Sequence, residues 1–230
     1  MLTATYVGFA LAQAALAVWA FALFARRRSL GAFVVALPIA LLVWDNSIVA
    51  LGALLGDGPL LVALSWPRFI GHALFTPIWI ITAFEYARRA GAGSLRGRWS
   101  HVAEWALYGS MAALGFARSV VLLRLEPVVQ GDLFYYTNGG GFPGPPIPAL
   151  VMVVVLIAAG VLVLRATGWR WMLIGGVVMF VAAAIPTSIV GFFVSNAGEV
   201  ALSLALVATE RFLQQRESAS LRAKGASRDE

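Results

Sequence analysis

The chain has 230 residues, of which 60% are hydrophobic and only 12% are charged, and its mean hydropathy is +0.85. A soluble domain is usually about 45–50% apolar and about 25% charged, so this composition excludes an ordinary soluble fold and indicates a membrane protein. The net charge of +6 does not indicate nucleic-acid binding, because the basic residues gather at the ends of apolar runs.

Seven apolar segments follow one another along the chain, and several have 18 or more residues with almost no charge. Such runs are long enough to cross a bilayer as helices, whereas barrel strands would alternate polar and apolar residues. The first run has no basic leader and extends to about Ala25, as in a retained helix rather than a cleaved signal peptide. We predict an all-α, polytopic seven-transmembrane-helix bundle at residues 1–213 and a disordered tail at 214–230. The predicted spans are 3–25, 30–55, 60–86, 101–123, 147–165, 170–186 and 189–212.

Basic residues are distributed unevenly between the connections. Fourteen of the 17 lysines and arginines follow spans one, three, five and seven or precede spans four and six. Cytoplasmic loops carry an excess of such residues, so the pattern predicts a multi-pass protein of the cell membrane. The N-terminus is expected outside and the C-terminus in the cytoplasm.

The one long connection on the opposite side is RLEPVVQGDLFYYTNGGGFPGPPIP, residues 124–148. Its glycines and prolines forbid a continued helix. The aromatic residues Phe134, Tyr135 and Tyr136 are typical of a loop anchored at the membrane interface. The alternative is a lid over a cavity.

Polar residues recur at helical spacing within the apolar spans. Ser65, Arg68, His72 and Thr76 form one stripe, and Ser195, Glu199 and Ser203 form another. A charge exposed to lipid at mid-depth costs about 2.5–3.5 kcal/mol, so both stripes are expected to face the bundle interior.

Depth along the helices predicts that several polar residues share one buried site. At about 1.5 Å per residue, Asp45 in span two lies at a similar level to the charged residues of spans three, four and seven. The catalytic candidates are Asp45, Glu199 and His72. The candidates for binding substrate or setting the ionisation of these groups are Arg68, Arg118, Asn46, Asn196 and Trp44.

Several chemistries are excluded. A retinal Schiff base needs a lysine in a membrane helix, and the only lysine is Lys224 in the tail. A three-histidine zinc site is impossible with two histidines, and the absence of cysteine excludes thiol chemistry. We recognise no nucleotide-binding or serine-nucleophile motif. We predict no cofactor and no metal, although one metal ion held by Asp45, His72 and Glu199 stays open.

Three functions remain open. An intramembrane enzyme would use two carboxyls in different environments as acid and base on a lipophilic substrate, with a lipid or isoprenoid as the partner. A proton-coupled carrier would use the same groups as an ion relay. In a structural or sensory protein, the charges would only fix helix packing. The oligomeric state is not predicted.

Trp44–Asp45 in the second span and Glu199 in the last span resemble the small seven-helix membrane-bound terpene cyclases. Those proteins carry an acid after a tryptophan early in the chain and another acid in the last helix. The likeness covers two short motifs, the two acids are exchanged in type, and the stripe at Arg68, His72 and Thr76 has no counterpart. The resemblance implies an isoprenoid substrate class.

Overall fold

The computed structural model describes residues 1–140, 146–185 and 191–226 of the chain. This part is mostly helical, as the composition predicts, with one β-hairpin. The main helices are α1 (Leu2–Arg27), α2 (Leu30–Leu55), α3 (Pro59–Leu74), α4 (Trp79–Ala90), α5 (Arg98–Phe116), α6 (Ile147–Thr167), α7 (Trp171–Ala184) and α9 (Phe193–Ala226). The hairpin consists of β1 (Leu125–Gln130) and β2 (Leu133–Asn138).

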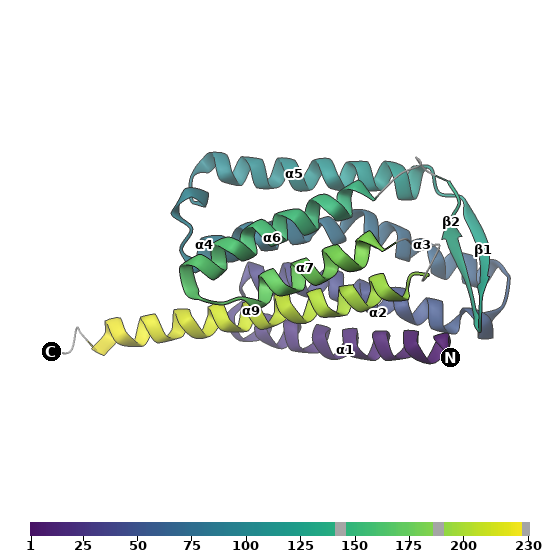
Figure 1. Ribbon diagram of the computed structural model, residues 1–230, viewed down its shortest axis with the longest axis horizontal. Helices are drawn as coiled ribbons and strands as arrows, with labels where there is room; N and C mark the ends of the chain where they lie inside the picture. The colour runs from purple at the N-terminus through teal and green to yellow at the C-terminus, as the bar shows by residue number, and fades with distance from the viewer. Residues whose placement is uncertain (141–145, 186–190, 227–230) are drawn as a thin grey trace.

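The helices run roughly along one axis of an elongated bundle (Figure 1). The hairpin lies at one end, which we call the hairpin end, together with the N-terminus. The opposite end is the arginine end, where α1, α4 and α6 finish with Arg26–Arg27, Arg88–Arg89 and Arg165. The bundle therefore carries its basic helix termini at one end and its strands at the other.

Three helices in the described residues are long and apolar enough to cross a membrane: α1, α2 and α6. The shorter helix α7 is also apolar. Large hydrophobic side chains such as Leu11, Val18 and Leu54 are exposed on the outer faces of α1 and α2. This arrangement is expected for helices whose outer faces contact lipid. The predicted limits at residues 186 and 189 lie outside the described residues.

The third predicted span, 60–86, is not one helix. Helix α3 ends at Leu74, the short 3₁₀ turn η1 (Thr76–Ile78) follows, and α4 begins at Trp79. Pro77 explains the break, because its ring removes an N–H donor and clashes with the preceding turn. Pro67 and Pro38 are accommodated inside α3 and α2.

The connection after the fourth span contains a structure that was not predicted. Helix α5 gives way to a π-helical turn, η3 (Ala117–Val121), and the hairpin pairs Leu125 with Asn138 and Gln130 with Leu133. Leu133, Tyr135 and Tyr136 are buried in the bundle. The connection therefore forms a hairpin that covers one end of the bundle.

The C-terminal segment also differs from the predicted disordered tail. Helix α9 continues to Ala226 and its last turns project beyond the bundle (Figure 1). The segment has good helix formers and no proline. Its first turns are held by polar contacts: Glu217 accepts from Nε of Arg89 at 2.7 Å, and Gln214 donates to Glu210 at 2.7 Å.

Buried ion pairs join the helices at the arginine end. Arg88 donates to Glu104 at 2.6 Å, and Arg89 donates to Glu210 at 2.6 Å. Each glutamate is only 1% exposed. Both acids are paired with arginines in the last turn of α4. They connect α4 to α5 and α9.

The hairpin is fixed to the helices at close range. A Cβ added to Gly52 in α2 would lie 1.8 Å from the backbone oxygen of Phe134 in β2, so only glycine permits this approach. Asp132 in the hairpin turn accepts from the backbone N–H of Leu2 at 2.8 Å and caps α1. The phenol of Tyr136 donates to Asp57.

We expect Gly52→Ala to destabilise the protein by about 2 kcal/mol or more, because the methyl group must push β2 away from α2. Thermal unfolding in a neutral detergent measures this loss. Gly8→Ala is the matched control, because a Cβ at Gly8 in α1 has no atom within 4 Å. Equal stability of the two variants would contradict the close contact.

Candidate functional site

A cavity of about 300 Å³ lies beneath the hairpin, among α1, α2, α3, β2 and α9. We call it the polar cavity. Its lining includes five residues that the sequence predicts to share one site: Asp45, Arg68, His72, Asn196 and Glu199. The structure thus brings together groups that are more than 150 residues apart in the chain.

Asp45 and Arg68 form the ion pair at the centre of the cavity. Nε of Arg68 donates to Oδ1 of Asp45 at 2.5 Å, and Nη1 donates to the backbone oxygen of Tyr136 at 3.1 Å. Both side chains are 10% exposed. One guanidinium therefore connects α3 to α2 and to the hairpin, and its charge is balanced by a carboxylate.

His72 lies one helical turn after Arg68 and faces the second oxygen of the same carboxylate. Its Nε2 is 3.6 Å from Oδ2 of Asp45, and its Nδ1 is 3.5 Å from Oγ1 of Thr76. The imidazole thus lies between a carboxylate near one ring nitrogen and a hydroxyl near the other. The imidazole has 38% of its surface exposed and lines the cavity, so it is accessible to a bound molecule.

Glu199 of α9 lines the same cavity but, unlike Asp45, is not paired with an arginine among the described residues. Its Oε2 is buried and has no hydrogen-bond partner among the described residues. Asn196, one turn earlier, donates to the backbone oxygen of Phe192 at 2.8 Å, while its own Oδ1 is buried and likewise has no partner in the described part of the chain. The site therefore contains one carboxylate paired with arginine and one carboxyl with unused bonding capacity.

Three tyrosines complete the upper wall of the polar cavity. Tyr6 is 3% exposed, and Tyr135 donates to Gln130 at 3.1 Å. Burial raises the pKa of Tyr135, and the hydrogen bond to Asp57 raises the pKa of Tyr136, so both phenols are neutral at physiological pH. Tyr6 was not selected from the sequence, where a single tyrosine near the start of an apolar helix gives no distinguishing signal.

An apolar cavity of about 420 Å³ adjoins the polar one and extends between α2, α6, α7 and α9. His72, Ser195 and Glu199 line both cavities. The remaining wall is mainly hydrophobic, with Leu42, Trp79, Met152, Met179 and Leu202. The ionisable groups therefore lie where a polar chamber meets an apolar one. Each volume lies within the range of small-molecule sites.

Three residues that the sequence predicts for this site lie outside the polar cavity. Trp44 and Asn46 precede and follow Asp45, so each points about 100° away from it around α2. The Trp44 indole donates to the backbone oxygen of Leu64 at 3.2 Å, and Asn46 donates to Leu42 at 2.9 Å within its own helix. Arg118, in the π-helical turn, lines a separate cavity of about 150 Å³ that also reaches His72.

The described residues contain no cluster of three or more histidine, aspartate or glutamate side chains suited to a metal ion. Asp45, His72 and Glu199, the residues considered for a single metal ion, do not form such a cluster. The second oxygen of Asp45 faces His72, and Arg68 occupies the first. A cation bound beside Arg68 would be repelled by the positive charge of its guanidinium group.

We expect Arg68→Met to destabilise the protein by about 3–5 kcal/mol, because it strands the buried Asp45 carboxylate. The double variant Asp45→Asn/Arg68→Met should recover part of this loss. Glu199→Gln should change stability by less than about 1 kcal/mol, because Glu199 has no ion-pair partner to lose among the described residues. Thermal unfolding in detergent tests all three. An unchanged melting temperature for Arg68→Met would contradict buried pairing.

No protein-family model matches this chain, and no curated protein matches its sequence significantly.

Proposed function

We propose that the protein is an intramembrane enzyme that performs acid/base chemistry on an amphiphilic lipid or isoprenoid. The observation that supports this proposal is the position of Glu199 and His72 at the junction of the two cavities. A lipophilic chain would occupy the apolar cavity, and the polar end or reactive group would lie among Asp45, His72 and Glu199. A charge cluster that served packing alone would have no use for a carboxyl oxygen left without a hydrogen bond beside an accessible cavity.

The two carboxyls have environments suited to opposite roles. Glu199 has no cationic hydrogen-bond partner in the described residues and borders hydrophobic walls, where a lone carboxylate is costly and the neutral form is favoured. It would donate a proton to the substrate. His72, oriented by Asp45 and Thr76, would accept a proton from a neighbouring position. The substrate would gain one proton and lose another, which corresponds to isomerisation or cyclisation of an unsaturated chain.

Arg68 would act as a positioning residue. Its bonds to Asp45 and to the Tyr136 backbone fix the carboxylate that orients His72. Asn196 would offer its available Oδ1 to a substrate hydroxyl. The side chains of Tyr6 and Tyr135 would shield the reacting groups from water on the hairpin side.

The same proposal includes a seven-span topology, with the hairpin end outside and the arginine end in the cytoplasm. The spans would be α1, α2, α3 with α4, α5, α6, α7 and α9. The gathering of Arg26, Arg88, Arg165 and Arg211 at one end supports this orientation through the positive-inside rule. The buried pairs of Arg88 and Arg89 with Glu104 and Glu210 lie at this same end.

Single cysteines test the orientation, because the natural chain has none. Val129→Cys lies at an exposed hairpin position, and Ser220→Cys lies at an exposed position of α9. In intact cells a membrane-impermeant maleimide should label the first and reach the second only after permeabilisation. Labelling of both before permeabilisation, or of Ser220→Cys alone, would overturn the orientation.

Lipids that co-purify with the protein test the activity. Mass spectrometry should find one discrete lipid or isoprenoid enriched in Glu199→Gln, because the variant retains the cavity and loses the proton donor. Cells that carry the wild-type protein should accumulate the converted product. For an isomerisation, this product has the same mass as the substrate and a different chromatographic retention time. His72→Gln should trap the same compound.

Glu126→Gln is the matched control, since it removes an exposed acid on β1 and leaves both cavities unchanged. It should behave as the wild type does. The same bulk membrane lipids in the wild type and every variant would contradict a catalytic pocket.

A proton-coupled carrier is the second candidate, and one observation favours it. Gln13, Thr82 and Ser203 are fully buried with side-chain atoms unpartnered among the described residues. On α1 and α9, Gln13 and Ser203 lie between residues that line the polar cavity and the arginine end. Proton uptake by reconstituted vesicles that is abolished in Ser203→Ala, with no lipid conversion, would support the carrier over the enzyme.

A further inference from the structure

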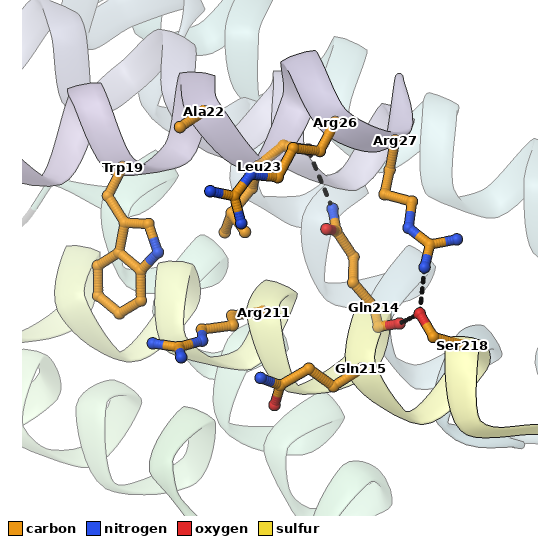
Figure 2. A pocket seen from close by; sticks show the side chains of 9 residues that line it. All are labelled: Trp19, Ala22, Leu23, Arg26, Arg27, Arg211, Gln214, Gln215 and Ser218. Carbon is orange, nitrogen blue, oxygen red and sulfur yellow. Dashed lines mark hydrogen bonds between the residues drawn. The ribbon is translucent and has the colours of Figure 1, made fainter.

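A second charged pocket lies at the arginine end, far along the bundle from the polar cavity. It has a volume of about 440 Å³ and lies between α1 and α9 (Figure 2). We call it the basic pocket. Arg26 and Arg27 enter its wall from α1, and Arg211 enters from α9. Trp19, Gln214, Gln215 and Ser218 also line the pocket.

The charge of the basic pocket is not balanced by its own lining. Among the described side chains that form the wall there are three arginines and no carboxylate. The nearest acids on α9 have other partners: Glu210 and Glu217 both accept from Arg89. Three guanidinium groups around one space favour an anion that can accept several N–H bonds at once.

The polar side chains hold the basic pocket in shape. Arg27 donates to Ser218, and Gln214 donates to the backbone oxygen of Leu23 at 3.4 Å, so α1 and α9 are joined across its floor (Figure 2). The guanidinium of Arg211 lies 5.9 Å from the centre of the Trp19 ring. Arg26, like Arg211, is an exposed residue that lines the pocket, so both guanidinium groups are accessible to a ligand.

An apolar track leads out of the basic pocket along α1. Ala22 lines the pocket, Val18 lies one turn before it on the same face, and Leu11 lies two turns further. Val18 is 70% exposed and Leu11 is 66% exposed. A small inorganic anion would not use this surface, but acyl chains attached to a phosphate would lie along it. Tryptophan at such a level is typical of the boundary between head groups and hydrocarbon.

We propose that the basic pocket binds the phosphate of an anionic phospholipid, with the acyl chains along the Leu11–Val18–Ala22 track. The bound lipid would join α1 to α9 at the end of the bundle where the ion pairs of Arg88 and Arg89 lie. Basic pockets between membrane helices on the cytoplasmic side are known to recognise phosphate-bearing head groups. The inference does not depend on the chemistry proposed for the polar cavity.

Titration of phosphatidylglycerol into the full-length protein in a neutral detergent tests this site. Native mass spectrometry counts the bound lipids, and thermal unfolding reports stabilisation. Phosphatidylcholine and inorganic phosphate are titrated separately. The wild type should retain phosphatidylglycerol and unfold at a higher temperature with it. Arg26→Gln/Arg211→Gln should bind it about tenfold more weakly.

Arg165→Gln/Arg170→Gln is the matched control, because it removes the same charge from exposed positions at the same end but outside the pocket. It should bind within about twofold of the wild type, since these arginines do not reach the pocket. Gln215→Glu is a second variant, which places an acid at an exposed position of the pocket wall and should also weaken binding.

Three results would overturn the inference. Equal weakening by both double variants would mean that general charge attraction accounts for binding. Undiminished binding in Arg26→Gln/Arg211→Gln and in Gln215→Glu would place the lipid elsewhere. Stabilisation by inorganic phosphate equal to that by phosphatidylglycerol would identify a free anion as the ligand.

Discussion

The Asp45–Arg68 ion pair is the interaction on which the candidate site depends. In a bundle with hydrophobic walls, neither charge is tolerated alone, and the guanidinium also bonds the backbone of Tyr136. The pair therefore fixes three elements relative to one another: α2, α3 and β2. It also determines what the remaining groups can do. Because Arg68 occupies one oxygen of Asp45, the other is left for His72.

The hairpin gives this interaction its enclosure. Gly52 lets β2 approach α2 until backbone nearly touches backbone, and Tyr135 and Tyr136 then cover the polar cavity. The break at Pro77 serves the same region, because Thr76 and His72 lie on either side of the end of α3. The result is a polar chamber closed by strands above and continued by an apolar chamber between the helices.

The two ends of the bundle use charge differently. At the hairpin end, one carboxyl is paired and another, on Glu199, keeps unused hydrogen-bonding capacity within the described residues. At the arginine end, Glu104 and Glu210 are fully engaged by Arg88 and Arg89, which suits packing. Arginines of α1 and α9 at the same end line the basic pocket. Chemistry is thus proposed where a buried acid is unsatisfied, and lipid binding where exposed cations are unbalanced.

Composition and periodicity by themselves determined the helical class, the apolar helices and the faces that carry Asp45, Arg68, His72 and Glu199. These features depend on local spacing and on the cost of exposing charge to lipid, which the order of residues fixes. The break in the third span was not predicted, because the apolar run continues on both sides of Pro77. The helical continuation of α9 was not predicted either, because the polar composition of the tail indicated disorder.

Only the tertiary structure decided which charges meet. Periodicity assigns a residue to a face and a depth but not to a neighbour, so it did not separate Trp44 and Asn46 from the cavity, and it placed Arg118 too close to it. Tyr6 joined the site because α1 packs on α2, and the hairpin became a cover because Gly52 admits it. These are contacts between segments distant in the chain, and their energies arise only when the helices are assembled.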